Sequence, residues 1–286
     1  MDECDVKTPG GVYLCQVDES ISCGACCGLY NVADPSFENI SSILQKRTEL
    51  FEQTPGDYDS LERFREQVEK SENQQRPYPE FHHCPYLGFV GANASRPGCL
   101  LHPLNKKNAS VDRRGLSHWG GFACATYFCP TCSAVAPRFK QILKMCCENW
   151  YIFGLIVTET ELISTYFSLI EKELASELDP IGLSANPAFI SAVKRFFNLK
   201  ISWPFRPMGF NRLANYFFND NLYPRTPINY TGLGSEHSDK DPVFRALGSE
   251  FVSRNDLELA EQRIFEAIQE ACDAVRSNPQ QGRDTP

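Results

Sequence analysis

Several cysteines in the first half of this 286-residue chain stand at spacings that suit metal binding. Eight of the thirteen cysteines lie between residues 23 and 132, and they include Cys-Gly-Ala-Cys-Cys at 23–27 and Cys-Pro-Thr-Cys at 129–132. A Cys-x-x-Cys pair places two sulfur atoms on one metal from a single tight turn, and a second pair or two separate ligands complete a tetrahedron. The spacing therefore predicts a metal-binding region built from both ends of this stretch.

Single cysteines and one histidine supply the other candidate ligands. Cys84, Cys99 and Cys124 lie in segments whose glycines and prolines allow sharp bends, and His102 follows Cys99 by three residues. Thiolate and imidazole groups bind zinc and iron. Eight thiols suffice for two four-coordinate sites, or for one iron–sulfur cluster with cysteines to spare. We predict as metal ligands Cys23, Cys26, Cys27, Cys84, Cys99, His102, Cys124, Cys129 and Cys132.

Cysteines are also common as reduced, buried residues of a hydrophobic core. This is the alternative to metal binding for the cluster as a whole. It is the favoured role for Cys146, Cys147 and Cys272, which lie in helical sequence patterns. Cys4 and Cys15 remain undecided between the two roles. No catalytic residue is identified from the sequence.

The metal is either zinc or the iron of an iron–sulfur cluster. The adjacent Cys26 and Cys27 favour iron, because neighbouring sulfurs can serve different atoms of a multinuclear centre. Zinc needs only a tetrahedron of sulfur and nitrogen ligands, which the same cysteines provide. Dithiol exchange at Cys129 and Cys132 ranks lower than metal binding, because no βαβ pattern of a thioredoxin-like domain surrounds this pair.

The same residues resemble the YkgJ-like cysteine-cluster family of zinc- or iron-chelating proteins. The resemblance covers roughly residues 20–132 and rests on Cys-Gly-Ala-Cys-Cys-Gly at 23–28, Cys-Pro-Tyr-Leu at 84–87 and Arg-Pro-Gly-Cys-Leu-Leu-His-Pro at 96–103. This chain departs from the family pattern in placing the Arg-Pro before the cysteine of the last segment. Some related proteins are described as lysine N-methylases of flagellin. The resemblance implies that the metal ligands include Cys23, Cys26, Cys27, Cys84 and Cys99.

The composition of the chain limits the class of protein and the cellular location that we expect. The net charge of −8 argues against a nucleic-acid-binding protein, which needs a basic surface. The most apolar run, residues 150–157, is too short to span a membrane. The N-terminal Met-Asp-Glu-Cys-Asp has neither the basic nor the apolar part of a signal peptide. We therefore expect a cytoplasmic protein, in which clustered cysteines indicate metal or redox chemistry more than disulfides.

The elements that must position these residues are mainly helices. Apolar side chains recur at helical spacing, and Asx-Pro or capping-box patterns mark several helix starts. Residues 73–134 and 201–250 lack such periods and are expected to be long loops, the second rich in aromatic residues. Those aromatic side chains either pack onto the helical core, which is favoured, or form a binding surface. The expected helices cover 34–51, 58–72, 138–153, 158–178, 186–197 and 255–277.

The predicted fold is mainly α, with an irregular cysteine-rich module held together by metal and packed on a helical part. The module covers residues 1–134 and the helical part 135–286, with one continuous domain as the alternative. Three functions fit this arrangement. The favoured one is a metal-binding protein of unassigned reaction. The alternatives are an iron–sulfur-dependent enzyme, such as a protein lysine N-methylase-like or redox enzyme, and an interaction protein with a structural zinc. The sequence specifies neither a substrate nor a partner.

Overall fold

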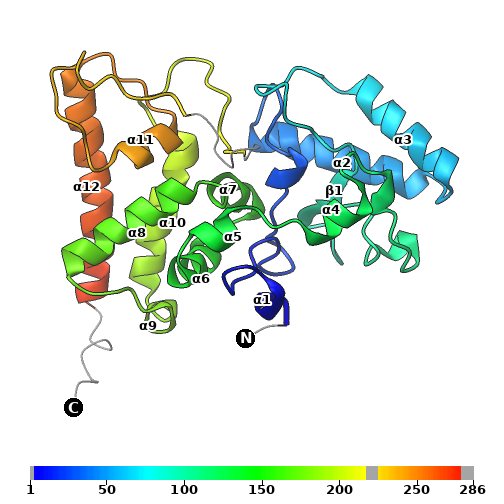
Figure 1. The fold of residues 1–286 in the computed structure, drawn as a ribbon, viewed down its shortest axis with the longest axis horizontal. Helices are drawn as coiled ribbons and strands as arrows, with labels where there is room; N and C mark the ends of the chain where they lie inside the picture. Colours follow the sequence, from blue (N-terminus) through cyan, green and yellow to red (C-terminus); the bar gives the residue numbers. More distant parts are fainter. Residues whose placement is uncertain (1–2, 217–224, 278–286) are drawn as a thin grey trace.

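The computed structural model describes residues 3–216 and 225–277 and confirms the mainly helical class (Figure 1). The long helices α8, α10 and α12 lie together at one end of the molecule, whereas α2 and α3 lie at the other. The helices are α1 (Glu3–Lys7), α2 (Phe37–Gln53), α3 (Tyr58–Ser71), α4 (Gly120–Thr126), α5 (Thr131–Ala134), α6 (Pro137–Cys146), α7 (Trp150–Ile156), α8 (Thr160–Leu174), α9 (Pro180–Ser184), α10 (Pro187–Ser202), α11 (Asp241–Leu247) and α12 (Arg254–Arg276).

Side-chain caps explain where the helices begin, and two of them differ from the prediction. α2 begins after Ser36, whose hydroxyl accepts a hydrogen bond from the backbone N–H of Asn39 at 3.3 Å, rather than at Asp34-Pro35. α12 begins after Ser253, which forms a capping box with Asp256. In both cases a serine supplies the hydroxyl acceptor that the first turn requires. The expected N-caps, Asp34 and Asn255, were therefore each wrong by two residues, although both helices exist.

The capping box expected at Thr158 does not form. α8 instead begins after Glu159, which makes no side-chain cap. The carboxylate of Glu159 is buried and pairs with Lys200 of α10 and with Arg225. An unpaired charge on the buried Lys200 would cost more free energy than a helix terminus without a side-chain cap. The tertiary ion pair therefore overrides the local capping pattern.

Residues 73–134 contain regular elements that the sequence did not reveal. Strands β1 (Leu87–Val90) and β2 (Arg96–Cys99) pair antiparallel, with Leu87 opposite Cys99. The short helices α4 and α5 follow, and a further helix, α11, interrupts the expected loop 201–250. These elements are four to seven residues long, too short to establish a period.

The main hydrophobic core joins the two predicted parts of the chain. It contains side chains of α6, α7, α8, α10 and α12, and also Val12, Leu14, Tyr30, Ile40 and Leu44 from the N-terminal part. The hydroxyl of Tyr30 donates a hydrogen bond to the carbonyl of Trp150 at 3.3 Å, at the start of α7. A boundary at residue 134 therefore does not separate this core into two.

A smaller core lies beneath α3 and supports the hairpin. Phe51 of α2 meets Phe64 of α3 edge to face, and Phe64 stacks on Tyr86 beside the hairpin. Leu100 and Leu101 complete this core. Within the described residues, no single helix is long and apolar enough to cross a membrane, and α7 with α8 meets that test only as a pair bent by 90°.

Candidate metal centre

The Cys23–Cys27 segment folds as a tight turn that is fixed against a distant part of the chain. A 3-10 turn over Ala25–Cys27 ends at Gly28, which has a φ of +80°. A Cβ atom at Gly28 would lie 2.2 Å from the carbonyl oxygen of His82. Only glycine fits both this conformation and this approach. The turn thereby holds the cysteines at 23–27 beside the segment that contains Cys84.

One group of thiols comprises Cys15, Cys23, Cys26 and Cys129. The backbone N–H of Cys23 donates to the carbonyl of Cys15 at 2.9 Å. Burial raises the pKa of Cys15 to about 12, and the nearby charges of Cys26 and Cys129 add to this effect. Burial also raises the pKa of Cys23, followed by the charges of Cys26, Cys129 and Cys15. We call these four residues the first thiol group.

A second thiol group comprises Cys27, Cys84, Cys99 and Cys124. The backbone N–H of Cys84 donates to the carbonyl of Cys27 at 2.8 Å. Burial raises the pKa of Cys84 to about 11 and that of Cys99 to about 12, and Cys124 acts on both. The hydrogen bond with Cys26 raises the pKa of Cys27 most, and burial raises it next. The charges of Cys84 and Cys99 raise it further.

Hydrogen bonds also join a thiol of one group to a thiol of the other group or to a cysteine outside both. A hydrogen bond from the Cys27 thiol lowers the pKa of Cys26. A hydrogen bond from the Cys132 thiol likewise lowers the pKa of Cys129 to about 7. The sulfur of Cys124 lies 3.0 Å from the hydroxyl oxygen of Ser117. These contacts orient the sulfur atoms toward neighbours in the sequence.

The described residues, 3–216 and 225–277, contain no group of three or more histidine, cysteine, aspartate or glutamate side chains arranged to hold a metal ion. The eight thiols of the two groups therefore lie near one another without converging on a common point. Their number and chemistry nevertheless fit metal binding, since four cysteines close a tetrahedral zinc site or hold one cluster.

Two predicted ligands are not assigned to either group. His102 is part-buried, and its Nδ1 accepts a hydrogen bond from the backbone N–H of Leu104 at 3.1 Å. The charged groups acting on His102 are Arg114, Asp112 and Arg96, and none is a cysteine. Cys132 is buried beside Cys129, and its pKa is raised by the hydrogen bond that it donates there. The surroundings of His102 thus contain no cysteine, whereas the charges of Cys129 and Cys15 act on Cys132. The prediction that both residues are ligands stays a prediction.

Cys15 is the candidate that the sequence left undecided. It has no Cys-x-x-Cys partner and precedes the clustered cysteines, so its spacing alone carries no signal. An isolated antiparallel bridge between Gln16 and Ser22 returns the chain on itself and brings Cys15 to Cys23. Cys146, Cys147 and Cys272 are buried, as expected for core cysteines.

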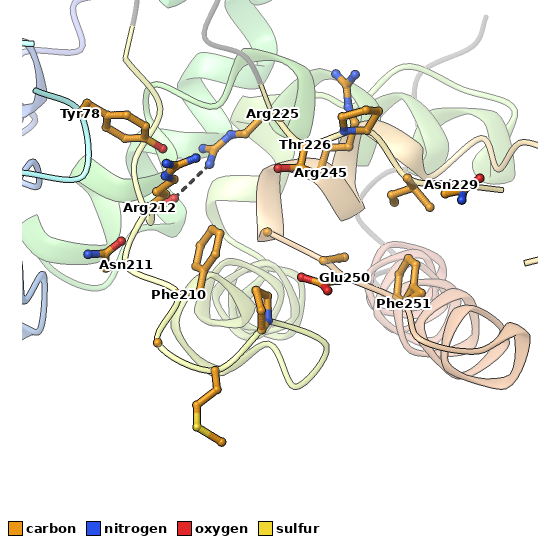
Figure 2. Close-up of a pocket in the computed structure, with 17 residues that line it drawn as sticks. Tyr78, Phe210, Asn211, Arg212, Arg225, Thr226, Asn229, Arg245, Glu250 and Phe251 are labelled. Carbon is orange, nitrogen blue, oxygen red and sulfur yellow. Dashed lines mark hydrogen bonds between the residues drawn. The ribbon is translucent and has the colours of Figure 1, made fainter. Parts of the chain in front are cut away.

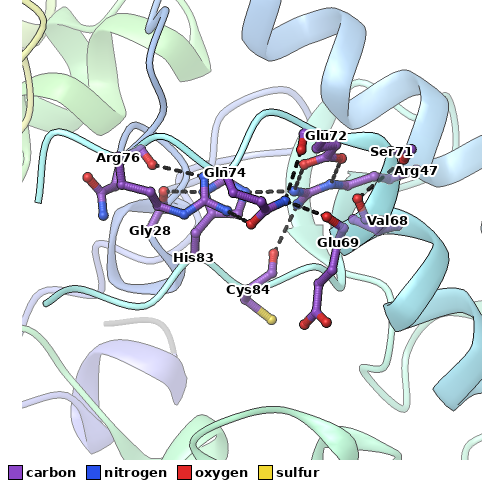
Figure 3. Close-up of polar contacts among 11 residues, drawn as sticks. Gly28, Arg47, Val68, Glu69, Ser71, Glu72, Gln74, Arg76, His83 and Cys84 are labelled. Carbon is purple, nitrogen blue, oxygen red and sulfur yellow. Dashed lines mark hydrogen bonds and ion pairs between the residues drawn. The ribbon is translucent and has the colours of Figure 1, made fainter. Parts of the chain in front are cut away.

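A buried polar network connects the turn after Cys27 to Cys84 (Figure 3). The guanidinium of Arg47 donates to both carboxylate oxygens of Glu72, at 2.7 and 2.5 Å, and to the carbonyl of Cys84 at 2.9 Å. It also contacts Nε2 of His83 at 2.7 Å, while Nδ1 of His83 lies 2.8 Å from the carbonyl of Gly28. Since arginine can only donate, His83 accepts through Nε2 and donates through Nδ1. This network fixes Cys84 relative to the turn.

The aromatic loops form part of the core and part of a cavity of about 600 Å³ (Figure 2). Trp203 and Tyr216 are buried, as favoured from the sequence. Phe210 lines the cavity with Arg212 and Phe251. Phe217 and Phe218, which belong to the same aromatic stretch, lie outside the described residues.

No family model, curated protein or solved structure matches this chain. The resemblance to the YkgJ-like family therefore stays a prediction based on the motifs themselves.

Proposed function

We propose that this protein binds metal at two centres, each held by four cysteines. Cys15, Cys23, Cys26 and Cys129 hold the first, and Cys27, Cys84, Cys99 and Cys124 hold the second. The main support is the different surroundings of Cys26 and Cys27. The charges of Cys26 and Cys129 act on Cys15 and Cys23, whereas the charges of Cys84 and Cys99 act on Cys27. Cys26 and Cys27 also hydrogen-bond each other, and Cys26 acts on Cys84, so the two proposed centres are neighbours.

The assignment of Cys26 and Cys27 to different centres bears on which metal is bound. If Cys26 and Cys27 serve separate centres, their adjacency no longer favours iron over zinc. Four cysteines satisfy zinc and also a cubane iron–sulfur cluster. With four protein ligands, zinc would have no open coordination position and would serve the structure, whereas a cluster would carry electrons.

The charged residues around the second group also favour metal binding. Four thiolates with one zinc ion leave a net negative charge, which nearby cations stabilise. Arg114 donates to the carbonyl of Cys124 at 3.3 Å, and the charges of Cys99 and Cys124 contribute to its raised pKa, after its hydrogen bond with Asp112. Arg47 lies against Cys84 on the other side.

Serine substitutions test the proposed ligand sets. We expect Cys15→Ser and Cys84→Ser each to lose about half of the bound metal, because each disrupts one of the two centres. Both should also lower the melting temperature, since metal-binding energy stabilises the fold. Cys272→Ser is the matched control and should retain full metal content. Cys132→Ser tests whether Cys132 only donates a hydrogen bond to Cys129, in which case it should also retain the metal. Full metal content in Cys15→Ser together with loss in Cys132→Ser would refute the proposed first set.

A further inference from the structure

A groove of about 920 Å³ lies between the end of α3 and the segment that leads to Cys84. Its walls include Arg76, Gln74, Phe81 and His82, together with Glu69 and Asn211. His82 and His83 directly precede Cys84, so the groove lies beside the second thiol group. A depression of this size is large enough for a small organic molecule.

Arg76 brings an uncompensated positive charge to this groove. Its guanidinium donates to the side-chain oxygen of Gln74 at 3.0 Å and to the carbonyl of Asn31 at 3.5 Å (Figure 3). Both acceptors are neutral, and Arg76 forms no ion pair among the described residues. Most part-buried arginines have an anionic partner, because a desolvated charge is costly without one.

The neighbouring charges do not supply that partner. Glu72 is occupied by the two hydrogen bonds from Arg47, and Glu69 interacts with Arg65 at 3.4 Å on the exposed side of α3. Burial and then the charge of Arg47 lower the pKa of Arg76, and the charge of Glu72 opposes both effects. Since Glu72 is paired with Arg47, the guanidinium of Arg76 is the charge that would attract an anion from solution to the groove.

Two aromatic side chains form one wall of the groove. The ring of His82 is held in place by stacking on His118, with centroids 4.1 Å apart. Phe81 adds an apolar surface to the same wall.

We propose that this groove binds a small anionic ligand, whose phosphate or carboxylate group is held by the guanidinium of Arg76. Planar guanidinium groups match both anions with paired hydrogen bonds. Phe81 and the ring of His82 contact the rest of the ligand. This proposal does not depend on whether the thiols bind metal.

Calorimetric titration of the full chain tests this site with two probes, inorganic phosphate and succinate. We expect saturable one-site binding of at least one probe. The Arg76→Gln variant should bind that probe at least about tenfold more weakly, because a charge-assisted hydrogen-bond pair is lost. Arg254→Gln is the matched control, since Arg254 is an exposed arginine of α12 paired with Glu258, and its affinity should be unchanged.

The preferred probe identifies the ligand chemistry: phosphate binding indicates a phosphate-bearing ligand and succinate binding a carboxylate. The proposal is overturned if neither probe binds saturably to the wild-type chain, or if Arg76→Gln binds as tightly as Arg254→Gln. Metal content measured on the same samples distinguishes failure of the proposed metal centres from failure of the proposed anion site. A metal-free chain that binds the probe through Arg76 would refute the metal centres alone.

Discussion

At the scale of single residues, the adjacent Cys26 and Cys27 organise the cysteine-rich region. They hydrogen-bond each other in the 3-10 turn, while Cys129 acts on Cys26 and Cys84 acts on Cys27, so one short segment contributes to both thiol groups. The sequence motif predicted that these residues are candidate ligands. It could not divide them into sets, because the division depends on how residues far apart in the chain approach each other.

Cys15 and His102 illustrate the limit of spacing arguments. His102 follows Cys99 at a typical ligand spacing, yet its Nδ1 accepts a hydrogen bond from a local turn. Cys15 has no such spacing, yet a bridge places it beside Cys23. The spacing of residues in the sequence shows which of them can lie close together within one turn. The tertiary fold determines which residues from different segments lie close together.

The raised thiol pKa values predict how metal affinity depends on pH. Burial raises the pKa of Cys84 to about 11 and those of Cys15 and Cys99 to about 12, so these thiols are protonated in the metal-free chain at neutral pH. Metal binding must release those protons, and affinity therefore falls as the pH decreases. Competition with a chelator should show weaker binding at about pH 6 than at about pH 8, by roughly tenfold per pH unit for each proton released. Equal affinities at the two values would contradict the assigned thiols.

At the scale of elements, the periodic helices were predictable and the short elements were not. α2, α3, α10 and α12 present regular apolar faces, and all were expected at nearly the observed positions. The hairpin β1–β2 and helices α4 and α5 depend on contacts with other parts of the chain. The failed capping box before α8 has the same origin, since Glu159 serves a buried lysine of another helix.

The contact between Tyr30 and α7 joins the N-terminal segment to the helical core, and Gly154 permits it. A Cβ atom at Gly154 would lie 1.9 Å from the hydroxyl oxygen of Tyr30. We expect Gly154→Ala to destabilise the fold by about 2 to 3 kcal/mol, because the tyrosine must shift within a packed core. Denaturant unfolding measures this change. Gly115→Ala is the control, since nothing lies within 4 Å of a Cβ atom there, and equal stability of the two variants would contradict this role of Tyr30.

At the scale of the whole molecule, one large core and one small core are joined by the cysteine-rich loops. The large core contains both N-terminal and C-terminal side chains, so the two predicted parts share it. The small core, under α3, holds the hairpin that carries Cys99. The N-terminal loops show no apolar periodicity, so the sequence did not predict that their side chains would pack in the helical core.

This arrangement predicts where metal removal loosens the molecule. We expect a chelator to accelerate hydrogen exchange in the turn at residues 23–28 and in residues 84–132, because most of the proposed ligands lie in these segments and metal binding would stabilise them. α8, α10 and α12 should keep their protection, since they bury one another in the large core. Hydrogen exchange by mass spectrometry resolves these segments, and uniform acceleration throughout the chain would show that the metal supports the whole core.

The most direct test of the two proposed centres is metal and sulfide analysis of protein purified without oxygen, together with its visible spectrum. Two four-cysteine centres predict either about two zinc ions per chain in a colourless protein, or iron and acid-labile sulfide in comparable amounts with broad visible absorption. Either result supports the central claim and identifies the metal. A chain purified in this way with intact thiols and no stoichiometric zinc or iron would contradict it.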